Sequence, residues 1–178
     1  MQDKTEFTYG EVIYEHFLPM LKLVSPQPGE IFWDVGCGGA KPVAIAALNF
    51  PELKACKGIE YLPKLCKVGQ DSIELMQQLV NSLDEKDKFQ LPETSIEQGD
   101  LLEKDWPSET DILYSSSVCF PEELTNGIAR MCERLKKGAR IISLNEFYID
   151  TSAYLEPVRL VKMKMTWGTQ VAFIYKRK

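Results

Sequence analysis

The residues with the clearest chemical potential are a glycine-rich segment and an acidic residue further along the chain. The segment 34–40 reads DVGCGGA and follows a short apolar run. Glycines between a strand and a helix let the backbone approach a ligand closely. Glu60 ends the next apolar run, and a carboxylate there can accept hydrogen bonds from both hydroxyls of a ribose. The two features together indicate a nucleoside site.

A second carboxylate, Asp100, stands in the sequence QGDLL over 98–102. It follows a third predicted strand, within reach of the exocyclic amine of an adenine. Each feature alone has a plainer interpretation as a bare turn, a surface carboxylate or a helix cap, but their order and spacing favour a site for adenosine joined to a small cationic group. The predicted cofactor contacts are Asp34, Gly36, Cys37, Gly38, Glu60, Asp100 and Leu101.

Other ligand classes lack their sequence signals. The dinucleotide pattern G-x-G-x-x-G needs glycine at position 41, where this chain has Lys41, and the sequence contains no G-x-x-x-x-G-K-[ST] loop. A nicotinamide cofactor and a nucleoside triphosphate are therefore disfavoured. The single His16 and five cysteines without a Cys-x-x-Cys pair predict no metal site.

The elements that must position these residues alternate between strands and helices. Apolar spacing predicts helices over 9–24, 41–50, 63–83 and 121–135, and strands over 31–35, 56–60, 94–98, 111–115, 139–144, 158–166 and 170–176. This order predicts an α/β fold, a doubly wound and mostly parallel seven-stranded sheet with a C-terminal antiparallel hairpin turning at 167–169. The hairpin differs from the ordinary dinucleotide fold and favours S-adenosylmethionine as the cofactor. We expect one domain over 1–178, with a helical cover over 1–29 and a sheet core over 30–178.

Composition limits the function classes further. The chain has 178 residues, 44% apolar and 26% charged, which fits one globular domain and excludes a disordered chain or a coiled coil. Its formal charge of −5 disfavours strong direct binding to nucleic acid. No apolar run is long enough to span a bilayer, and the start of the chain lacks the apolar core of a signal peptide. With unpaired cysteines, these features predict an intracellular protein, cytoplasmic or nuclear, that does not bind membranes.

Several segments in order resemble the class I, seven-strand methyltransferases. More narrowly, the chain is similar to the disruptor-of-telomeric-silencing family, the histone lysine methyltransferases that lack a SET domain. The segments that carry this resemblance are 9–11 (YGE), 98–106, 112–120, 137–147 and 165–173. The chain departs from the family at Ser116 and Ser117, which stand where the family has Asn-Asn, and at Phe173, where the family usually has Tyr.

The resemblance implies a protein-lysine N-methyltransferase that uses S-adenosylmethionine, with an exposed lysine of a protein such as a histone as acceptor. It adds Tyr9 and Glu11 to the cofactor contacts, and position at a strand end adds Ser115. The expected acceptor residues are Ser116, Ser117, Phe120, Phe147, Trp167 and Phe173. Core packing is the alternative for the aromatic residues among them.

The chemistry itself needs few reactive groups. Methyl transfer from a sulfonium is an in-line displacement, so it depends mainly on alignment of donor and acceptor. A lysine acceptor must first lose a proton, and an apolar aromatic channel favours the neutral amine. Two other functions stay open: a class I methyltransferase acting on a small molecule or another protein atom, and a non-catalytic subunit that binds S-adenosylmethionine. The sequence does not indicate an oligomeric state.

Overall fold

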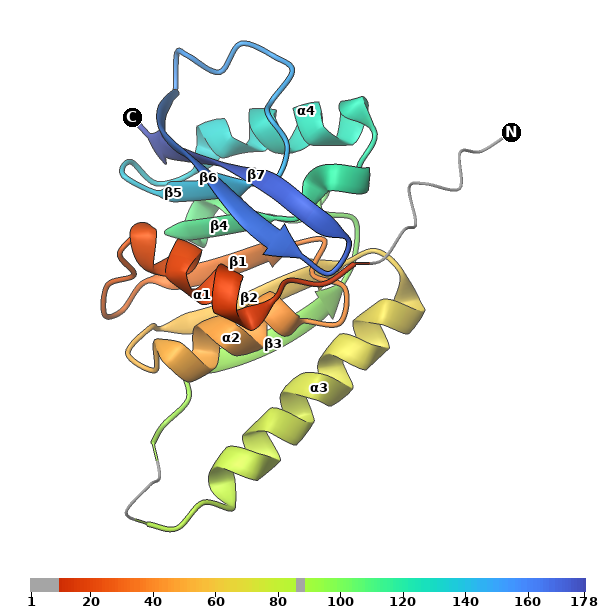
Figure 1. Cartoon of the computed structure of the whole chain (residues 1–178), viewed down its shortest axis with the longest axis vertical. Coiled ribbons are helices and arrows are strands. Elements are labelled where there is room, and N and C mark those ends of the chain that lie inside the picture. The colour runs from red at the N-terminus through yellow and green to blue at the C-terminus, as the bar shows by residue number, and fades with distance from the viewer. Residues whose placement is uncertain (1–9, 86–88) are drawn as a thin grey trace.

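The computed structural model describes residues 10–85 and 89–178 of the chain. Its strands form one seven-stranded sheet in the order β3-β2-β1-β4-β5-β7-β6 (Figure 1). The strands are β1 (Ile31–Val35), β2 (Ala55–Glu60), β3 (Glu93–Gln98), β4 (Ile112–Ser115), β5 (Arg140–Ser143), β6 (Leu155–Met165) and β7 (Gly168–Arg177). The structure confirms the predicted α/β sheet and its C-terminal hairpin.

The direction of the strands brings their functional ends together. β1 pairs in parallel with β2 and β4, β2 with β3, and β4 with β5, whereas β7 is antiparallel to both β5 and β6. The chain order therefore reverses on either side of β1, which is the point where doubly wound sheets bind ligands beyond the carboxyl ends of their strands. All five residues of β1 are buried, as expected for a strand covered on both faces.

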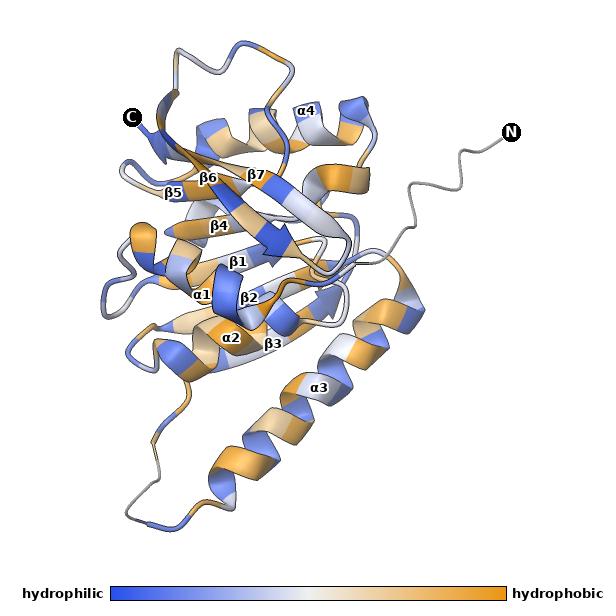
Figure 2. Ribbon diagram, viewed as in Figure 1, coloured by the Kyte–Doolittle hydropathy of each residue, from blue (hydrophilic) through white to orange (hydrophobic). Residues whose placement is uncertain are grey.

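Helices cover both faces of the sheet. Three of them, α1, α2 and α3, lie on one face, and α4 lies on the other (Figure 1). The helices are α1 (Tyr14–Leu23), α2 (Lys41–Asn49), α3 (Pro63–Asn81) and α4 (Glu122–Met131), with the 3-10 turns η2 (Pro107–Glu109), η3 (Ser117–Cys119) and η4 (Cys132–Arg134). Figure 2 shows apolar residues concentrated along the central strands β4 and β5.

Each face has its own hydrophobic cluster. On the α1–α3 face, Phe17 of α1 meets Tyr114 of β4 edge to face, with ring centroids 4.9 Å apart. On the α4 face, Phe147 stacks on Tyr175 at 5.2 Å. Aromatic pairs in these arrangements add to the apolar area that each cluster buries. The two clusters fix the strands from both sides and so hold their carboxyl ends in place.

The first helix differs from its prediction. Apolar spacing predicts a helix from residue 9, but α1 begins at Tyr14. The preceding residues pair with the end of β6 instead, since Val12 forms a bridge with Met165, and the Glu11 carbonyl accepts a hydrogen bond from the Thr166 amide at 3.1 Å. Tertiary pairing thus overrides the helical pattern and draws this segment to the C-terminal hairpin.

Several other boundaries shift by a few residues: the strand predicted over 158–166 begins at Leu155, and the helix predicted over 63–83 ends at Asn81. The predicted helix over 121–135 ends at Met131 and continues as the 3-10 turn η4. The hairpin turns at Thr166 and Trp167, because Gly168 already pairs with Met165 as the first residue of β7. Within the two described ranges, no helix is long and apolar enough to cross a membrane.

Candidate active site

A cavity of about 480 Å³ lies at the carboxyl ends of the parallel strands. Its volume falls within the usual range for small-molecule sites. Because parallel strands all end at the same edge, residues at or after the ends of β1, β2, β3 and β4 meet there. The predicted site residues that line this cavity are Glu11, Asp34, Gly36, Cys37, Gly38, Glu60, Asp100, Leu101, Ser116, Phe120 and Trp167.

The glycine-rich turn is fixed against the end of β2. The backbone amides of Gly36 and Cys37 both donate to the Ile59 carbonyl, at 2.9 and 3.0 Å. Gly36 has φ +81°, and a Cβ atom added there would lie 2.5 Å from Cζ of Phe120. Only glycine meets both conditions without strain, so the turn and Phe120 can lie close together at the cavity.

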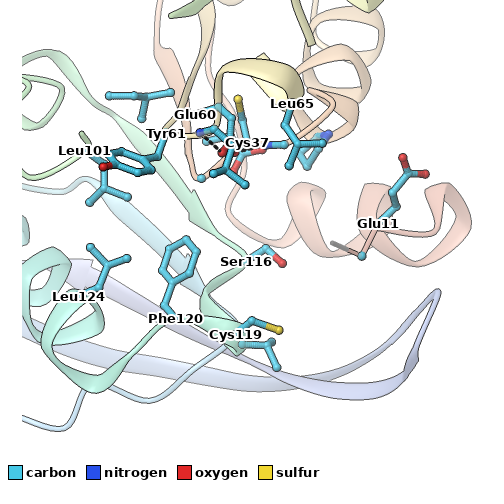
Figure 3. Close-up of a pocket in the computed structure, with 18 of the residues that line it drawn as sticks. Glu11, Cys37, Glu60, Tyr61, Leu65, Leu101, Ser116, Cys119, Phe120 and Leu124 are labelled. Carbon is cyan, nitrogen blue, oxygen red and sulfur yellow. Dashed lines mark hydrogen bonds between the residues drawn. The ribbon is translucent and has the colours of Figure 1, made fainter. Parts of the chain in front are cut away.

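Glu60 is the best-anchored acid of the site. Its two carboxylate oxygens accept hydrogen bonds from the amides of Gly38 and Leu62, both at 2.8 Å (Figure 3). The residue is buried. Since each carboxylate oxygen has more than one acceptor position, both can accept a further bond from a ligand hydroxyl. Asp100 is held similarly, with the Leu102 amide donating to Oδ1 at 2.8 Å.

Asp34 is buried without a partner. Its exposed fraction is 1%, and neither carboxylate oxygen has a hydrogen bond within the described part of the chain. Burial, and then the negative charge of Glu60, raise the pKa of Asp34 well above its ordinary value. An unpaired buried carboxylate is costly, and a cationic ligand group beside it offsets that cost. This side of the cavity therefore suits a ligand with a positive charge.

Apolar side chains form opposing walls between these acids and the cavity mouth. Figure 3 shows Phe120 and Leu124 facing Tyr61 and Leu101 across the cavity. The Leu101 backbone is anchored by Trp106, whose Nε1 donates to the Leu101 carbonyl at 2.7 Å. Such walls suit a flat ring held between them, and adenine has that shape.

Three segments meet at the mouth of the cavity. Trp167, 40% exposed, packs on Gly10, where an added Cβ would lie only 2.2 Å from the indole Cε3. Glu11 ties the same segment to the hairpin, since its amide donates to Thr166 Oγ1 at 3.0 Å. Lys41, at the start of α2, forms an ion pair with Glu11 at 3.3 Å. The N-terminal segment, the hairpin and α2 thus border one opening.

Only one member of the predicted serine triplet reaches the cavity. Ser116 lines it, whereas Ser115 and Ser117 are buried. The Ser117 hydroxyl lies 3.2 Å from that of Ser143 and makes a hydrogen bond with it. Successive side chains point in different directions where β4 passes into the turn η3, so three consecutive serines cannot all face the ligand.

Two predicted channel residues lie elsewhere. Phe147 and Phe173 do not line the cavity but pack in the cluster on the α4 face. Phe173 follows Gln170, which does line the cavity, by three residues. Side chains alternate along a strand, so an odd spacing puts Phe173 on the opposite face of β7. In this structure both phenylalanines therefore have the core-packing position that the sequence left open as the alternative to an acceptor channel. The predicted cofactor contact Tyr9 lies outside the described residues.

Sequence reasoning missed other residues that line the cavity. They are Gly10, Val12, Lys41, Pro42, Ile59, Tyr61, Leu62, Leu65, Gly99, Val118, Cys119, Pro121, Leu124 and Gln170. Adjacency to Glu60 would have indicated Tyr61 and Leu62. Leu124 and Gln170 carry no comparable signal, because they reach the cavity only through the packing of α4 and β7.

Comparison with known families decides the affiliation. The protein-family model described as "Histone methylation protein DOT1" matches residues 2–161. The chain belongs to this DOT1 family. It is also 24% identical over 185 residues to "Histone-lysine N-methyltransferase, H3 lysine-79 specific" of Aspergillus fumigatus, covering 97% of this chain and 35% of that protein. The chain thus spans about a third of the length of this DOT1 relative.

Solved structures agree on the fold of this DOT1-family chain. TrmN from Thermus thermophilus matches with a TM-score of 0.72 and 13% identity, over 98% of this chain and 52% of that one. An RNA methyltransferase from Salinibacter ruber, crystallised with S-adenosyl-L-homocysteine, matches with a TM-score of 0.64 and 18% identity, over 90% and 88%. The predicted class I methyltransferase fold is confirmed.

The described residues also fit the cofactor of the DOT1 family. S-adenosylmethionine combines a ribose, an adenine and a cationic methionyl group, and the cavity presents Glu60, Asp100 and the unpaired Asp34. With family membership, this fit confirms the prediction of S-adenosylmethionine as cofactor. No group of three or more His, Cys, Asp or Glu side chains in the described ranges has the arrangement of a metal site.

Proposed function

We propose that this chain is an S-adenosylmethionine-dependent protein-lysine N-methyltransferase, with an exposed lysine of a protein such as a histone as acceptor. The observation that carries the donor half is the unpaired, buried Asp34 in the same cavity as the anchored Glu60. Family membership supports the acceptor half.

The donor side supplies recognition. When bound, the cofactor provides a methyl group activated on a sulfonium. Glu60 would hold the ribose hydroxyls, Asp100 the adenine amine and Asp34 the positive charge of the methionyl portion. Tyr61, Leu101 and Leu124 would contact the adenine and exclude water. The fold already holds the Glu60 and Asp100 carboxylates in place through backbone amides, whereas the ligand's positive charge would favour the ionised form of Asp34.

The acceptor side controls the proton and the approach of the amine. Deprotonating a lysine at neutral pH costs roughly 4 to 5 kcal/mol, and apolar surroundings reduce this cost by disfavouring the charged form. Trp167 and Phe120 would provide such surroundings at the mouth. The Ser116 hydroxyl oxygen would accept a hydrogen bond from the amine and so orient its lone pair. Ser115 and Ser117 are buried and have no part in this proposal.

The cysteines support an intracellular setting for this reaction, cytoplasmic or nuclear. All five are free thiols, and four of them are buried. Proteins of oxidising compartments commonly pair such residues, whereas reduced thiols are typical inside cells. A chain with a net charge of −5 would meet a basic histone more readily than free nucleic acid.

Methyl transfer from tritiated S-adenosylmethionine tests the proposal. We expect label to enter histones or nucleosomes, and mass spectrometry to place it on lysine. The same proteins with acetylated lysine amines are the control and should take up no label. Label only in a small-molecule fraction of a cell extract would contradict the protein acceptor. Donor binding in calorimetry without transfer to any acceptor would instead identify a non-catalytic subunit.

A further inference from the structure

Asp34 and Tyr114 are neighbours at the centre of the sheet. β1 and β4 lie side by side (Figure 1), and their parallel register sets Asp34 opposite Tyr114. Adjacent strands are about 4.8 Å apart, and residues in register point to the same face of a sheet. Tyr114 belongs to the cluster on the α1–α3 face, so the Asp34 side chain points to that face as well. On its other side Asp34 is in register with Gly58 of β2, which has no side chain. Among the residues in register with Asp34, Tyr114 is thus the one with a polar side chain.

The Tyr114 hydroxyl, like the Asp34 carboxylate, is buried and lacks a partner. Tyr114 has an exposed fraction of 0%, and its hydroxyl oxygen makes no hydrogen bond within the described part of the chain. Burial, and then the charge of Asp34, raise the pKa of this hydroxyl, while the nearby Ser116 lowers it. The hydroxyl therefore keeps its proton near neutral pH, and it lies close to two residues that line the cavity.

An ionised Asp34 needs hydrogen-bond donors on more than one side. A carboxylate has about four acceptor positions, and a ligand in the cavity can reach only those on the cavity side. Leaving the others without a donor in the interior is costly. A hydroxyl donates more strongly to an ionised carboxylate than to a neutral oxygen such as that of Ser116. The Tyr114 hydroxyl is therefore suited to the sheet side of the carboxylate.

The other titratable groups around this carboxylate do not supply such a donor. Glu60 and Asp100 are themselves acids, and the Lys41 ammonium pairs with Glu11 at 3.3 Å. The Cys37 thiol is a weak donor, and burial raises its pKa well above the ordinary value. The remaining groups, none of which donates to the carboxylate, are Tyr61 and Cys119 of the cavity wall and Cys66 of α3.

We propose that the Tyr114 hydroxyl donates a hydrogen bond to ionised Asp34 and is thereby a positioning residue for the cationic group of the methyl donor. This inference rests on the role of Asp34 under the proposed function. Tyr114 acts through Asp34, because it stabilises the carboxylate both in the free protein and beneath the bound ligand. A hydrogen bond to the charged form of an acid lowers its pKa, so the Tyr114 hydroxyl extends donor binding to lower pH.

The pH dependence of donor binding in Tyr114→Phe tests this role. The variant loses the hydroxyl but keeps the ring that packs on Phe17. Without the hydroxyl the pKa of Asp34 should rise further. At a pH below that pKa, where binding must remove the proton, calorimetry with S-adenosylmethionine should show about tenfold weaker affinity, equivalent to a shift of about one pH unit. The difference from wild type should narrow as pH rises and both proteins ionise, whereas a loss of shape alone would weaken binding equally at every pH.

A double-mutant cycle with Asp34→Asn tests whether Tyr114 acts through Asp34. An amide at position 34 does not ionise, so Tyr114→Phe should change donor affinity by less than about twofold in that background. The matched control is Tyr154→Phe, which removes a hydroxyl that donates to the Ala129 carbonyl at 3.1 Å, outside the cavity. It should leave donor affinity and its pH dependence unchanged.

Thermal unfolding verifies that all variants are folded. Tyr114→Phe should be no less stable than wild type, because it removes a buried hydroxyl without a partner. Equal losses of donor affinity in the wild-type and Asp34→Asn backgrounds would overturn the proposal, since Tyr114 would then act on the donor directly. So would wild-type affinity of Tyr114→Phe at low pH while Asp34→Asn binds weakly. If Asp34→Asn itself left donor affinity unchanged, the role of Asp34 under the proposed function would fail as well, which distinguishes the two failures.

Discussion

The two sides of the cavity are built on different principles. On the donor side, Asp34 lies within β1 and Glu60 ends β2, and both are buried at the centre of the sheet. On the acceptor side, Ser116 and Phe120 flank a 3-10 turn, and Trp167 lies in a hairpin turn. The donor side is thus held by hydrogen-bonded strand ends, and the acceptor side by loops, which vary more easily among related proteins.

The two sides also differ in charge. The proposed donor side has three carboxylates, those of Asp34, Glu60 and Asp100, whereas the proposed acceptor side has the Ser116 hydroxyl and aromatic rings, with the Glu11–Lys41 ion pair at the mouth. If the proposed roles hold, donor recognition depends on charge, and acceptor recognition on shape and apolar contact. Changes of charge should therefore act on the donor, and changes of side-chain volume on the acceptor.

The largest effect is expected at Glu60. Glu60→Ala removes the predicted ribose contact and also frees the amides of Gly38 and Leu62 that the carboxylate now binds. We expect donor binding, measured by calorimetry, to weaken by about 1.5 to 3 kcal/mol. Glu60→Gln keeps one acceptor oxygen and should give a smaller loss.

A matched acidic residue outside the cavity controls this result. Glu97 of β3 is half-exposed and pairs with Lys104 at 3.2 Å, so Glu97→Ala should leave donor affinity unchanged. Unchanged affinity in Glu60→Ala, with the protein folded, would contradict the ribose assignment and remove the charge-based distinction between the two sides.

An intermediate effect is expected at Asp34, and it depends on pH. Burial and the charge of Glu60 raise the pKa of Asp34, so the folded protein without ligand holds this proton more tightly than the unfolded chain does. The contribution of Asp34 to folding stability is therefore present at low pH and is lost as pH rises through the raised pKa. Asp34→Asn should remove this loss and unfold at an equal or higher temperature than wild type as pH increases.

Asp34→Asn should weaken donor binding, although it maintains or raises the stability of the fold. A cationic ligand favours ionised Asp34, so wild-type affinity should rise with pH and binding should release a proton. Calorimetry in buffers of different ionisation enthalpy measures that release. Asp34→Asn should bind about 1 to 2 kcal/mol more weakly, without the proton release. A wild-type affinity that does not change with pH would count against Asp34 as the partner of the positive charge.

The contrast between the two sides also explains what the sequence could predict. Strand ends and glycine turns have local signals, so Asp34, Gly36, Glu60 and Asp100 could be predicted from short motifs in order. The mostly parallel sheet and its C-terminal antiparallel hairpin could also be predicted, from the alternation of strands and helices. These features depend on neighbours within a few residues along the chain.

The acceptor side depends on contacts between distant segments, which leave little local signal. Gln170 faces the cavity and Phe173 the α4 cluster only because of the register of β7. The N-terminal segment departs from its helical pattern because the Glu11 backbone pairs with the hairpin. A shift of one residue reverses the face of a strand residue, so a motif match alone could not place the aromatic channel.

The smallest of these effects is expected at Trp167. Trp167→Ala removes apolar surface at the mouth but leaves Asp34, Glu60 and Asp100 in place. We expect kcat/KM for a protein acceptor to fall about tenfold, equivalent to about 1.4 kcal/mol. The dissociation constant of the donor should change by less than about twofold. Steady-state transfer assays and calorimetry measure the two quantities separately.

Two further variants decide whether Trp167 acts through the acceptor. Trp167→Phe keeps an aromatic ring on Gly10 and should recover most of the acceptor activity. Leu160→Ala removes another exposed apolar side chain of the same hairpin, on β6, and should leave both constants unchanged. If donor affinity and acceptor turnover fell in parallel in Trp167→Ala, the residue would be supporting the whole cavity. The distinction between a charged donor side and an apolar acceptor side would then fail at the mouth, where Trp167 and the Glu11–Lys41 pair lie together.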